Sequence, residues 1–375
     1  MIVERPAVER RILGALEDGR IPVLLGGCAI GRTSLLLRTE QLLGPERAQY
    51  LDFGAAATTP ERWHSAIVRT SRVQPAGFQE AAAASPRAAF DATMAFFDKA
   101  SVPKGQPTFL IDEILDIRTF ENFPGLRQVQ RDVIARLASS PAAFVLASRF
   151  TSRAHRQLRD APARFEVVHV PPMSTGEVQG LADRFDGGPA REHAGAIAAL
   201  TAGRAGYAHL LLDALGLMGP ATDPVAALAS LLAPEGRLTA RCRESYELRL
   251  HRARGYGALK AILGILAAEE PQNLTEIAHH LRRTPGSTKD YLSWLEDVDV
   301  LSMHGKRYSY NDPLVRLYVR LYGGPTPPTD ADIVREVRRY AQAALPAAAP
   351  PEPASVPVAS RGVETERPSG IIEID

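Results

Sequence analysis

Short apolar runs alternate with segments of helical periodicity over residues 1–172 of the chain. Residues 6–16 and 34–43 show the helical pattern, with apolar side chains recurring every three to four positions. The apolar runs, which we interpret as buried strands, are 21–25, 49–53, 108–111, 143–147 and 165–170. Strands that alternate with helices predict an α/β core in which helices cover both faces of a parallel sheet.

The strand pattern ends at Pro171. The sequence Ser174-Thr175-Gly176-Glu177 has the spacing of a capping box, in which the serine and the glutamate satisfy the first backbone N–H groups of a helix. Helical spacing continues from there, so we expect a helical lid over residues 173–255.

A mixed pattern follows over residues 256–324. A helix around 259–266 ends before Pro271, a second begins after Asn273, and a third covers 287–296 after a turn at Thr284–Ser287. Two short strands, 300–303 and 307–310, then form a hairpin. This order predicts an α+β winged-helix domain.

The end of the chain divides into a helix and a tail. The region 325–344 carries an amphipathic helix over 330–344, and residues 345–375 are rich in proline and alanine, which predicts disorder. The last segment, Gly370–Asp375, is apolar enough to dock on a partner as an added strand, and an inert tail end fits it equally well.

Composition narrows the class of protein. A formal net charge of +1 provides no general attraction to nucleic acid or to an anionic membrane. No run reaches the ~18 uninterrupted apolar residues of a membrane span, and the charged start of the sequence lacks a signal-peptide pattern. Two cysteines cannot form a disulfide framework. We therefore expect a cytoplasmic protein without a membrane partner.

The segment Gly26–Thr33 fits the phosphate-loop pattern G-x-x-x-x-G-K-[ST] at every fixed position but one. Its glycines let backbone N–H groups fold around phosphate oxygens, the next helix directs its dipole at them, and Thr33 is suited to Mg²⁺. The predicted nucleotide-binding residues, with one from a later strand, are Gly26, Gly27, Cys28, Ala29, Ile30, Gly31, Arg32, Thr33, Ser34 and Ser148.

Arg32 stands where the pattern has lysine. Arginine keeps the positive charge but spreads it over a planar fork, so binding is better supported than catalysis. Cys28 lies at a variable position of the loop, where we favour a small filler over a reactive thiol at a helix N-terminus.

Two further strand ends complete the predicted site. The strand Thr108–Ile111 is followed by Asp112 and Glu113, which predicts that Asp112 supports Mg²⁺ and that Glu113 polarises the attacking water. Another strand ends in Ser148 and Arg149, where Ser148 is placed to sense the γ-phosphate and Arg149 is either an arginine finger or a surface residue. Because such ends meet at one edge of a parallel sheet, we expect an ATP·Mg²⁺ site there.

These elements resemble the STAND branch of the AAA+ ATPases, particularly its archaeal-type members, over roughly residues 2–324. The resemblance implies a molecular switch whose domain arrangement and oligomeric state depend on the nucleotide, with Arg149 close to the γ-phosphate. Besides Arg32, two signatures depart from the family pattern. Glu4-Arg5-Pro6 stands for the motif G-R-E, and Gly203-Arg204-Ala205 stands for the lid motif G-x-P.

Three functions fit the sequence. The first is an ATP-binding switch with slow or partner-dependent hydrolysis, acting on an unknown protein partner and capable of nucleotide-dependent homo-oligomerisation. The second is a DNA-binding regulator that uses 256–324 and binds nucleotide only structurally. The third is an adaptor that has lost nucleotide. The DNA surface would comprise Arg282, Arg283, Thr288, Lys289, Tyr291, Ser293, Lys306 and Arg307. The more basic helix 237–254 is either a further DNA surface or, as we slightly favour, a solvated face or an interdomain contact.

Overall fold

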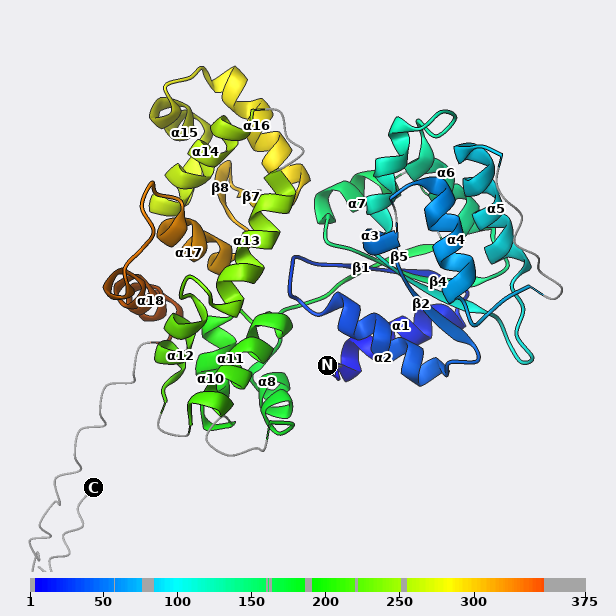
Figure 1. The fold of residues 1–375 in the computed structure, drawn as a ribbon, viewed down its shortest axis with the longest axis horizontal. Helices are drawn as coiled ribbons and strands as arrows, with labels where there is room; N and C mark the ends of the chain where they lie inside the picture. The colour runs from blue at the N-terminus through cyan, green and yellow to red at the C-terminus, as the bar shows by residue number, and fades with distance from the viewer. Residues whose placement is uncertain are drawn as a thin grey trace, which may run out of the picture. The chain divides into compact units, whose positions relative to one another are not determined.

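The predicted strands pair into one parallel sheet in the order β2-β3-β4-β1-β5 (Figure 1). This computed structural model describes residues 4–56, 58–75, 84–159, 161, 164–185, 191–219, 222–250 and 255–346. The strands are β1 (Ile21–Leu25), β2 (Ala48–Asp52), β3 (Thr108–Asp112), β4 (Ala143–Ser148) and β5 (Phe165–His169). The order leaves β4 between β1 and β3, so the phosphate loop and the acidic pair leave the sheet one strand apart.

Helices cover both faces of the sheet, as predicted (Figure 1). One face carries α1 (Pro6–Glu17) and α2 (Arg32–Leu43), and the other carries α4 (Pro60–Thr70), α5 (Pro86–Lys99) and α6 (Val129–Ser139). Side chains of β1 alternate between the two faces of the sheet. Leu24 packs in the core beneath α1 and α2, and Val23 packs in the core on the opposite face, beneath α4, α5 and α6. Short helices α3 (Phe53–Ala56) and α7 (Thr151–Leu158) and the 3₁₀ helix η1 (Ile114–Asn122) follow strands β2, β4 and β3.

Several predicted boundaries move by one or two residues. Helix α2 begins at Arg32, two residues before the predicted start, because Gly31 takes the left-handed conformation that ends the loop. Strand β2 ends at Asp52 because Phe53 begins α3. Strand β5 ends at His169, one residue before the predicted end.

In the segment after β5 the described residues form helices joined by turns and irregular stretches, with no strand among them before β6. The predicted capping box is confirmed at α8 (Thr175–Ala182), where Ser174 and Glu177 each accept the other's backbone N–H. Further helices are α10 (Ala194–Leu200), α11 (Ala205–Met218), α12 (Pro224–Leu231) and α13 (Arg237–Leu250).

The next elements are α14 (Tyr256–Ala268), β6 (Gln272–Asn273), α15 (Leu274–Leu281), α16 (Pro285–Asp297), β7 (Leu301–His304), β8 (Arg307–Tyr310) and α17 (Pro313–Tyr322). The strands form an antiparallel sheet in the order β6-β8-β7, and the short β6 was not predicted. Helix α16 begins inside the predicted turn, because Thr284 accepts a hydrogen bond from the Ser287 N–H and so caps the helix at Pro285.

The predicted terminal helix is present as α18 (Asp330–Ala344). The described residues as far as Leu345 belong to one compact unit. Most of the predicted tail, 347–375, lies outside the described residues, and Gly370–Asp375 with it. Among the helices that the structure describes, none combines the length and the apolar character that crossing a membrane requires.

Candidate functional site

The phosphate loop leaves β1 at Gly26 and enters α2 at Arg32. Gly31 has φ 105° and Ala29 has φ 60°, so the loop turns tightly through left-handed conformations. Among the described residues no side chain caps the N-terminus of α2. A helix of this length with an uncapped N-terminus and a glycine-rich approach is suited to bind phosphate through its backbone N–H groups.

Thr33 and Asp112 lie in direct contact. The Thr33 hydroxyl donates to Asp112 Oδ2 at 2.5 Å, and the Tyr50 hydroxyl donates to the same oxygen at 3.2 Å. Burial raises the pKa of Asp112, and the charge of Glu113 adds to the rise. Mg²⁺ in nucleotide sites takes few protein oxygens and completes its shell with phosphate and water. The hydroxyl and the carboxylate are therefore oxygen groups suited to hold a nucleotide-bound Mg²⁺.

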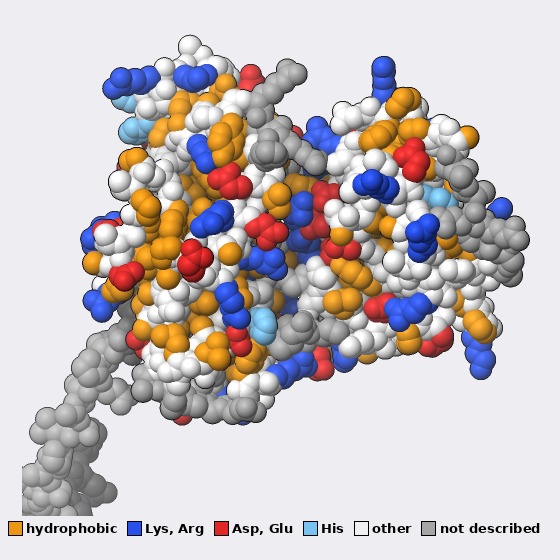
Figure 2. Space-filling view, viewed as in Figure 1, with side chains coloured by type: hydrophobic (Ala, Val, Ile, Leu, Met, Phe, Trp, Pro, Cys, Tyr) orange, Lys and Arg blue, Asp and Glu red, His pale blue; other side chains and the backbone are white. Residues whose placement is uncertain are grey.

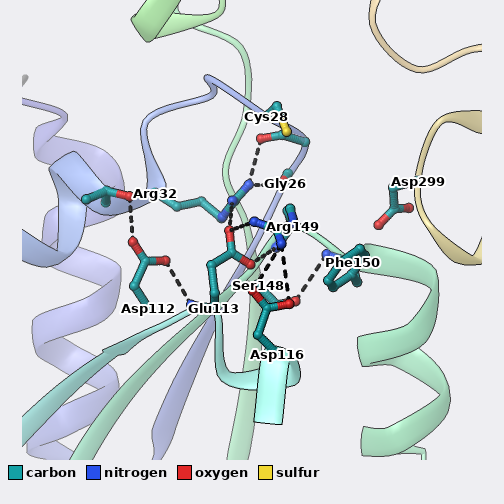
Figure 3. Close-up of polar contacts among 12 residues, drawn as sticks. Gly26, Cys28, Arg32, Asp112, Glu113, Asp116, Ser148, Arg149, Phe150 and Asp299 are labelled. Atoms are coloured by element: carbon teal, nitrogen blue, oxygen red, sulfur yellow. Dashed lines mark hydrogen bonds and ion pairs between the residues drawn. The ribbon is translucent and has the colours of Figure 1, made fainter. Parts of the chain in front are cut away.

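Arg32 folds back over its own loop (Figure 3). Its Nη1 donates to the carbonyl oxygens of Gly26 and Gly27, the latter at 2.6 Å, and its Nη2 donates to Glu113 Oε1 at 2.6 Å. The side chain is 8% exposed, and its Nε has no hydrogen-bond partner among the described residues. The fork thus connects the phosphate loop with the acidic residue after β3.

Glu113 is held from a second side by Arg149. The backbone N–H of Arg149 donates to Glu113 Oε2 at 3.1 Å, and its Nη1 lies 3.5 Å from Oε1. Arg149 Nη2 also pairs with Asp116 at 3.0 Å. Both carboxylate oxygens of Glu113 are therefore engaged, and its φ of 51° is a strained value for a non-glycine residue. Arg149 therefore lies in the site, but its guanidinium faces the carboxylates of Glu113 and Asp116.

Ser148 lies at the end of β4, as predicted, but its side chain is fully buried. Its hydroxyl accepts a hydrogen bond from the Phe150 N–H at 3.1 Å and so supports the turn into α7. The guanidinium of Arg149 lies over the Phe150 ring, 4.9 Å from its centroid. In this arrangement Ser148 shapes the strand end instead of presenting its hydroxyl to the loop.

Cys28 contacts a helix far along the chain. Arg249 Nη2 lies 2.7 Å from its sulfur, and the Ser245 hydroxyl donates to the sulfur at 3.4 Å. Burial acts to raise the pKa of the Cys28 thiol, but the charge of Arg249 and the Ser245 hydrogen bond bring that pKa below its usual value. The thiol therefore has specific partners, which the filler interpretation did not include.

Arg204 lies in the segment Gly203-Arg204-Ala205, which stands in place of the lid motif G-x-P. Its side chain connects the phosphate loop to the C-terminal region. Its Nη1 donates to the Cys28 carbonyl and its Nη2 to the Asn311 carbonyl, both at 2.5 Å. It also lies 3.5 Å from Asp312, and the Gly206 N–H donates to the Ala29 carbonyl at 2.8 Å. The lid and the C-terminal region thus contact the same short loop.

Sequence reasoning missed several residues of this site. Tyr50 and Asp116 follow no motif: Tyr50 lies in the middle of β2, and Asp116 lies in η1, beyond the end of β3. Asp299 accepts a hydrogen bond from the Thr151 N–H at the start of α7, and its own carbonyl accepts from Arg249 Nη1 at 2.9 Å. The positive φ of 54° at Asp299 is unusual for aspartate, but it is not visible in the sequence.

The structure differs from the predicted basic surfaces at two residues, Thr288 and Arg249, which are both buried. Thr288 is fully buried, and its hydroxyl donates to the Thr284 carbonyl one turn back, so it is not available to DNA as predicted. Arg249 of the arginine-rich helix is 8% exposed and makes the contacts with Cys28 and Asp299 described above. Figure 2 shows basic and acidic side chains interspersed over the face that it draws, as the small net charge leads us to expect.

Comparison with known proteins reveals the fold. No protein-family model matches the chain, and no curated protein matches its sequence. The Walker-type ATPase of Pyrococcus abyssi superposes with a TM-score of 0.63 at 17% identity over 85% of this chain and 96% of that one. The ORC1 protein of Aeropyrum pernix in complex with DNA gives a TM-score of 0.44 at 15% identity, covering 86% of this chain and 94% of that one.

A STAND protein with a tetratricopeptide repeat sensor from Pyrococcus horikoshii gives a TM-score of 0.37 at 16% identity, covering 86% of this chain and 43% of that one. The first similarity, with the strand order and the converging strand ends, shows that the chain has an α/β P-loop NTPase fold of AAA+-like architecture.

Proposed function

We propose that the chain is an ATP-binding molecular switch of the STAND type, which binds ATP with Mg²⁺ and hydrolyses it slowly or only with a partner. The observation that carries the proposal is the contact between Thr33 and Asp112 beside the uncapped N-terminus of α2. Segments separated by 79 residues meet there in the arrangement that a metal-bound triphosphate requires. A loop that only supported the fold would not need the Thr33 hydroxyl and the Asp112 carboxylate to meet beside this helix N-terminus.

The residues divide the work among phosphate, metal and water. The backbone of Gly26–Thr33 and the Arg32 side chain would hold the phosphates, with Ser34 in the first turn of α2. Thr33 and Asp112 would hold Mg²⁺, which neutralises charge on the phosphates when bound. Glu113 would orient and polarise the attacking water once its two arginine partners release it.

Slow turnover follows from the state of Glu113. Arg32 and Arg149 occupy both of its oxygens, and the guanidinium groups keep the carboxylate from acting as a base toward water. A γ-phosphate supplies an alternative partner for both arginines, since phosphate and carboxylate compete for the same planar fork. We infer that a bound partner protein completes this exchange.

Coupling to domain arrangement rests on Arg204 and Arg249. Both contact Cys28 of the loop, and both also bond to carbonyl oxygens of the C-terminal region, those of Asn311 and Asp299. A phosphate that reshapes the loop changes the position of the Cys28 carbonyl and sulfur. The region 256–324, which we propose is a winged-helix domain, would then move relative to the lid 173–255 and the core 1–172.

The exposed arginines of the C-terminal region favour DNA as the alternative partner. Arg282, Arg283 and Lys289 are all exposed around the start of α16. A regulator that contacts DNA there and holds nucleotide structurally predicts duplex binding that weakens steeply with salt. Binding that is lost in Arg282→Ala, Arg283→Ala and Lys289→Ala, without any turnover, would favour this alternative over the switch.

The test of the proposal compares wild type with Arg32→Lys and Glu113→Gln. Equilibrium binding of labelled ATP, with and without Mg²⁺, distinguishes the switch from an adaptor that has lost nucleotide. Glu113→Gln should bind ATP but not hydrolyse it. Molar mass measured with ATP and with ADP tests the proposed nucleotide-dependent homo-oligomer. Absence of Mg²⁺-dependent ATP binding in the wild type would refute the proposal.

We place the protein in the cytoplasm because Cys28 and Cys242 are both free thiols.

A further inference from the structure

A hollow of about 650 Å³ lies among α13, α14, α17 and α18. That volume is within the range of sites that hold small molecules. None of the phosphate-loop residues contributes to its lining. The side chains that matter for its chemistry are Tyr246, Glu247, Lys260, Tyr318, Arg320 and Glu336.

Two tyrosines in the lining have unused hydroxyl groups. Tyr246 is 6% exposed and Tyr318 is 7% exposed, and neither hydroxyl has a hydrogen-bond partner within the described part of the chain. Their rings lie 6.0 Å apart at 62°, and Tyr318 stacks on Tyr322 with 5.2 Å between centroids. Neither hydroxyl is among the fully enclosed polar atoms that lack a partner, so both are open to the solvent of the hollow and available to a polar ligand that contacts aromatic rings.

The charged residues in the lining are balanced. Lys260 Nζ lies 3.1 Å from Glu247 Oε1, and Arg320 Nη2 lies 2.8 Å from Glu336 Oε2. The first pair is partly open to solvent, with side-chain exposures of 40% and 41%. A multiply charged anion would meet a carboxylate beside each cation. A zwitterion can place its carboxylate against Lys260 and its ammonium against Glu247, so that opposite charges face each other.

Helix α13 connects the hollow with the phosphate loop. Tyr246 and Glu247 line the hollow, while Ser245 and Arg249 of the same helix contact Cys28. At 100° per residue, Ser245 and Arg249 share one face of the helix and Glu247 lies nearly opposite. A small rotation or shift of α13 on binding in the hollow therefore changes the contacts of Arg249 with the loop.

We propose that this hollow is an effector site for a small zwitterion that carries a planar ring, of which a free aromatic amino acid is the simplest member. The second part of the proposal, that occupancy alters nucleotide affinity through α13, rests on the proposed function. Linkage then requires that nucleotide alters effector affinity by the same factor.

The site itself is tested by calorimetric titration of L-tryptophan into the full-length protein without nucleotide. Saturable binding is expected, with L-leucine, which lacks the ring, and tryptamine, which lacks the carboxylate, each at least about tenfold weaker. Tyr246→Phe and Tyr318→Phe keep the rings and should each weaken binding about fivefold, as loss of one neutral hydrogen bond does. Lys260→Met should weaken it further.

Tyr291→Phe on α16, outside the hollow, is the matched control and should bind tryptophan like the wild type. No saturable binding to the wild type, or equal affinity in Tyr246→Phe, Tyr318→Phe and Lys260→Met, would overturn the site. Saturating tryptophan should change ATP affinity by about 5- to 150-fold. Tryptophan binding without any such change overturns the coupling alone, and tryptophan binding to a protein that does not bind ATP leaves the site standing while the proposed function fails.

Discussion

Arg32 and Glu113 form a partly buried ion pair of 2.6 Å that joins the phosphate loop to the acidic residue after β3. Their side chains are 8% and 12% exposed. The same guanidinium also donates to the Gly27 carbonyl, which a lysine ammonium of smaller reach and different geometry does not reproduce. The departure of position 32 from the phosphate-loop pattern is thus a structural device that keeps Glu113 engaged.

Arg32→Lys should raise steady-state ATP hydrolysis, by about 10- to 100-fold. Lysine keeps the charge for the phosphates but lacks the fork that holds Glu113, and proper placement of a catalytic group is worth rate factors of this order. Phosphate release under saturating ATP and Mg²⁺ measures the effect. Arg38→Lys, on the same helix but paired with Glu4 and Glu9, is the control. Unchanged ATP affinity and hydrolysis in Arg32→Lys would show that the fork does not restrain Glu113.

Thr33→Ala should weaken ATP binding about tenfold in the presence of Mg²⁺ and leave metal-free binding nearly unchanged. The hydroxyl contacts Asp112 and is a metal ligand candidate, whereas the loop backbone holds phosphate without it. Fluorescent-nucleotide titrations with Mg²⁺ and with a chelator measure both affinities. Thr70→Ala, whose hydroxyl donates to the Ala66 and Ile67 carbonyls of its own helix, is the control. An equal loss with and without metal would assign Thr33 to phosphate binding.

As the pH falls, the Mg²⁺ enhancement of ATP affinity should be lost at a higher pH than it would be if Asp112 were an exposed aspartate. Burial and the charge of Glu113 raise the pKa of Asp112, and a protonated carboxyl cannot ligate the metal. The Mg²⁺ enhancement of ATP affinity should therefore decline, as the pH falls, at a higher pH than the ordinary aspartate value of 3.8. Titrations over a pH series measure the decline. A Mg²⁺ enhancement that persists unchanged down to the ordinary value would contradict the role of Asp112.

The sequence predicts the core of this site well because parallel strands bring their carboxyl ends to one edge. Gly26–Thr33, Asp112 and Arg149 each follow a short apolar run, and the sheet order places those runs beside one another. The sequence does not predict which partners the side chains bond to. Residue type assigns Ser148 to the γ-phosphate and Thr288 to DNA, but each hydroxyl bonds to a backbone group two to four residues away. Sequence spacing does not reveal this competition.

Contacts between distant segments could not be predicted. Arg204 and Arg249 reach Cys28 across 176 and 221 residues, and only the packing of the lid and the C-terminal region on the core brings them there. The arginine-rich composition of the helix that includes Arg249 does not separate a DNA surface from a solvated face or a contact with another part of the chain. Burial decides between them at Arg249, where the side chain is 8% exposed.

Arg204→Met should uncouple the loop from the C-terminal region. Methionine fills much of the space but leaves the carbonyl oxygens of Cys28 and Asn311 without their donors, which should cost about 1–3 kcal/mol of unfolding free energy. Hydrogen exchange at residues 311–315 should then no longer respond to ATP. Arg237→Met, which loses only an exposed pair with Asp213, is the control. A nucleotide response that survives in Arg204→Met would locate the coupling elsewhere.

Asp299→Asn should remove a pH dependence of stability. Burial raises the pKa of Asp299 from 3.8 to about 6 in the folded protein, so the folded state holds more protons than the unfolded state between those values. The free energy of unfolding therefore falls as pH rises through that window, and this loss is complete above the folded pKa. Asparagine still accepts the Thr151 N–H but does not titrate.

The stability of Asp299→Asn relative to wild type should consequently improve between pH 5 and pH 7.5, by on the order of 1 kcal/mol, because about one pKa unit of the shift lies in that interval. Denaturant unfolding at the two pH values measures the difference. Asp297→Asn, two residues away and in an open pair with Arg156, should show the same difference from wild type at both. If the Asp299→Asn and wild-type curves stay parallel over this range, Asp299 is already ionised at pH 5 and the contact between α7 and the C-terminal region does not depend on its protonation.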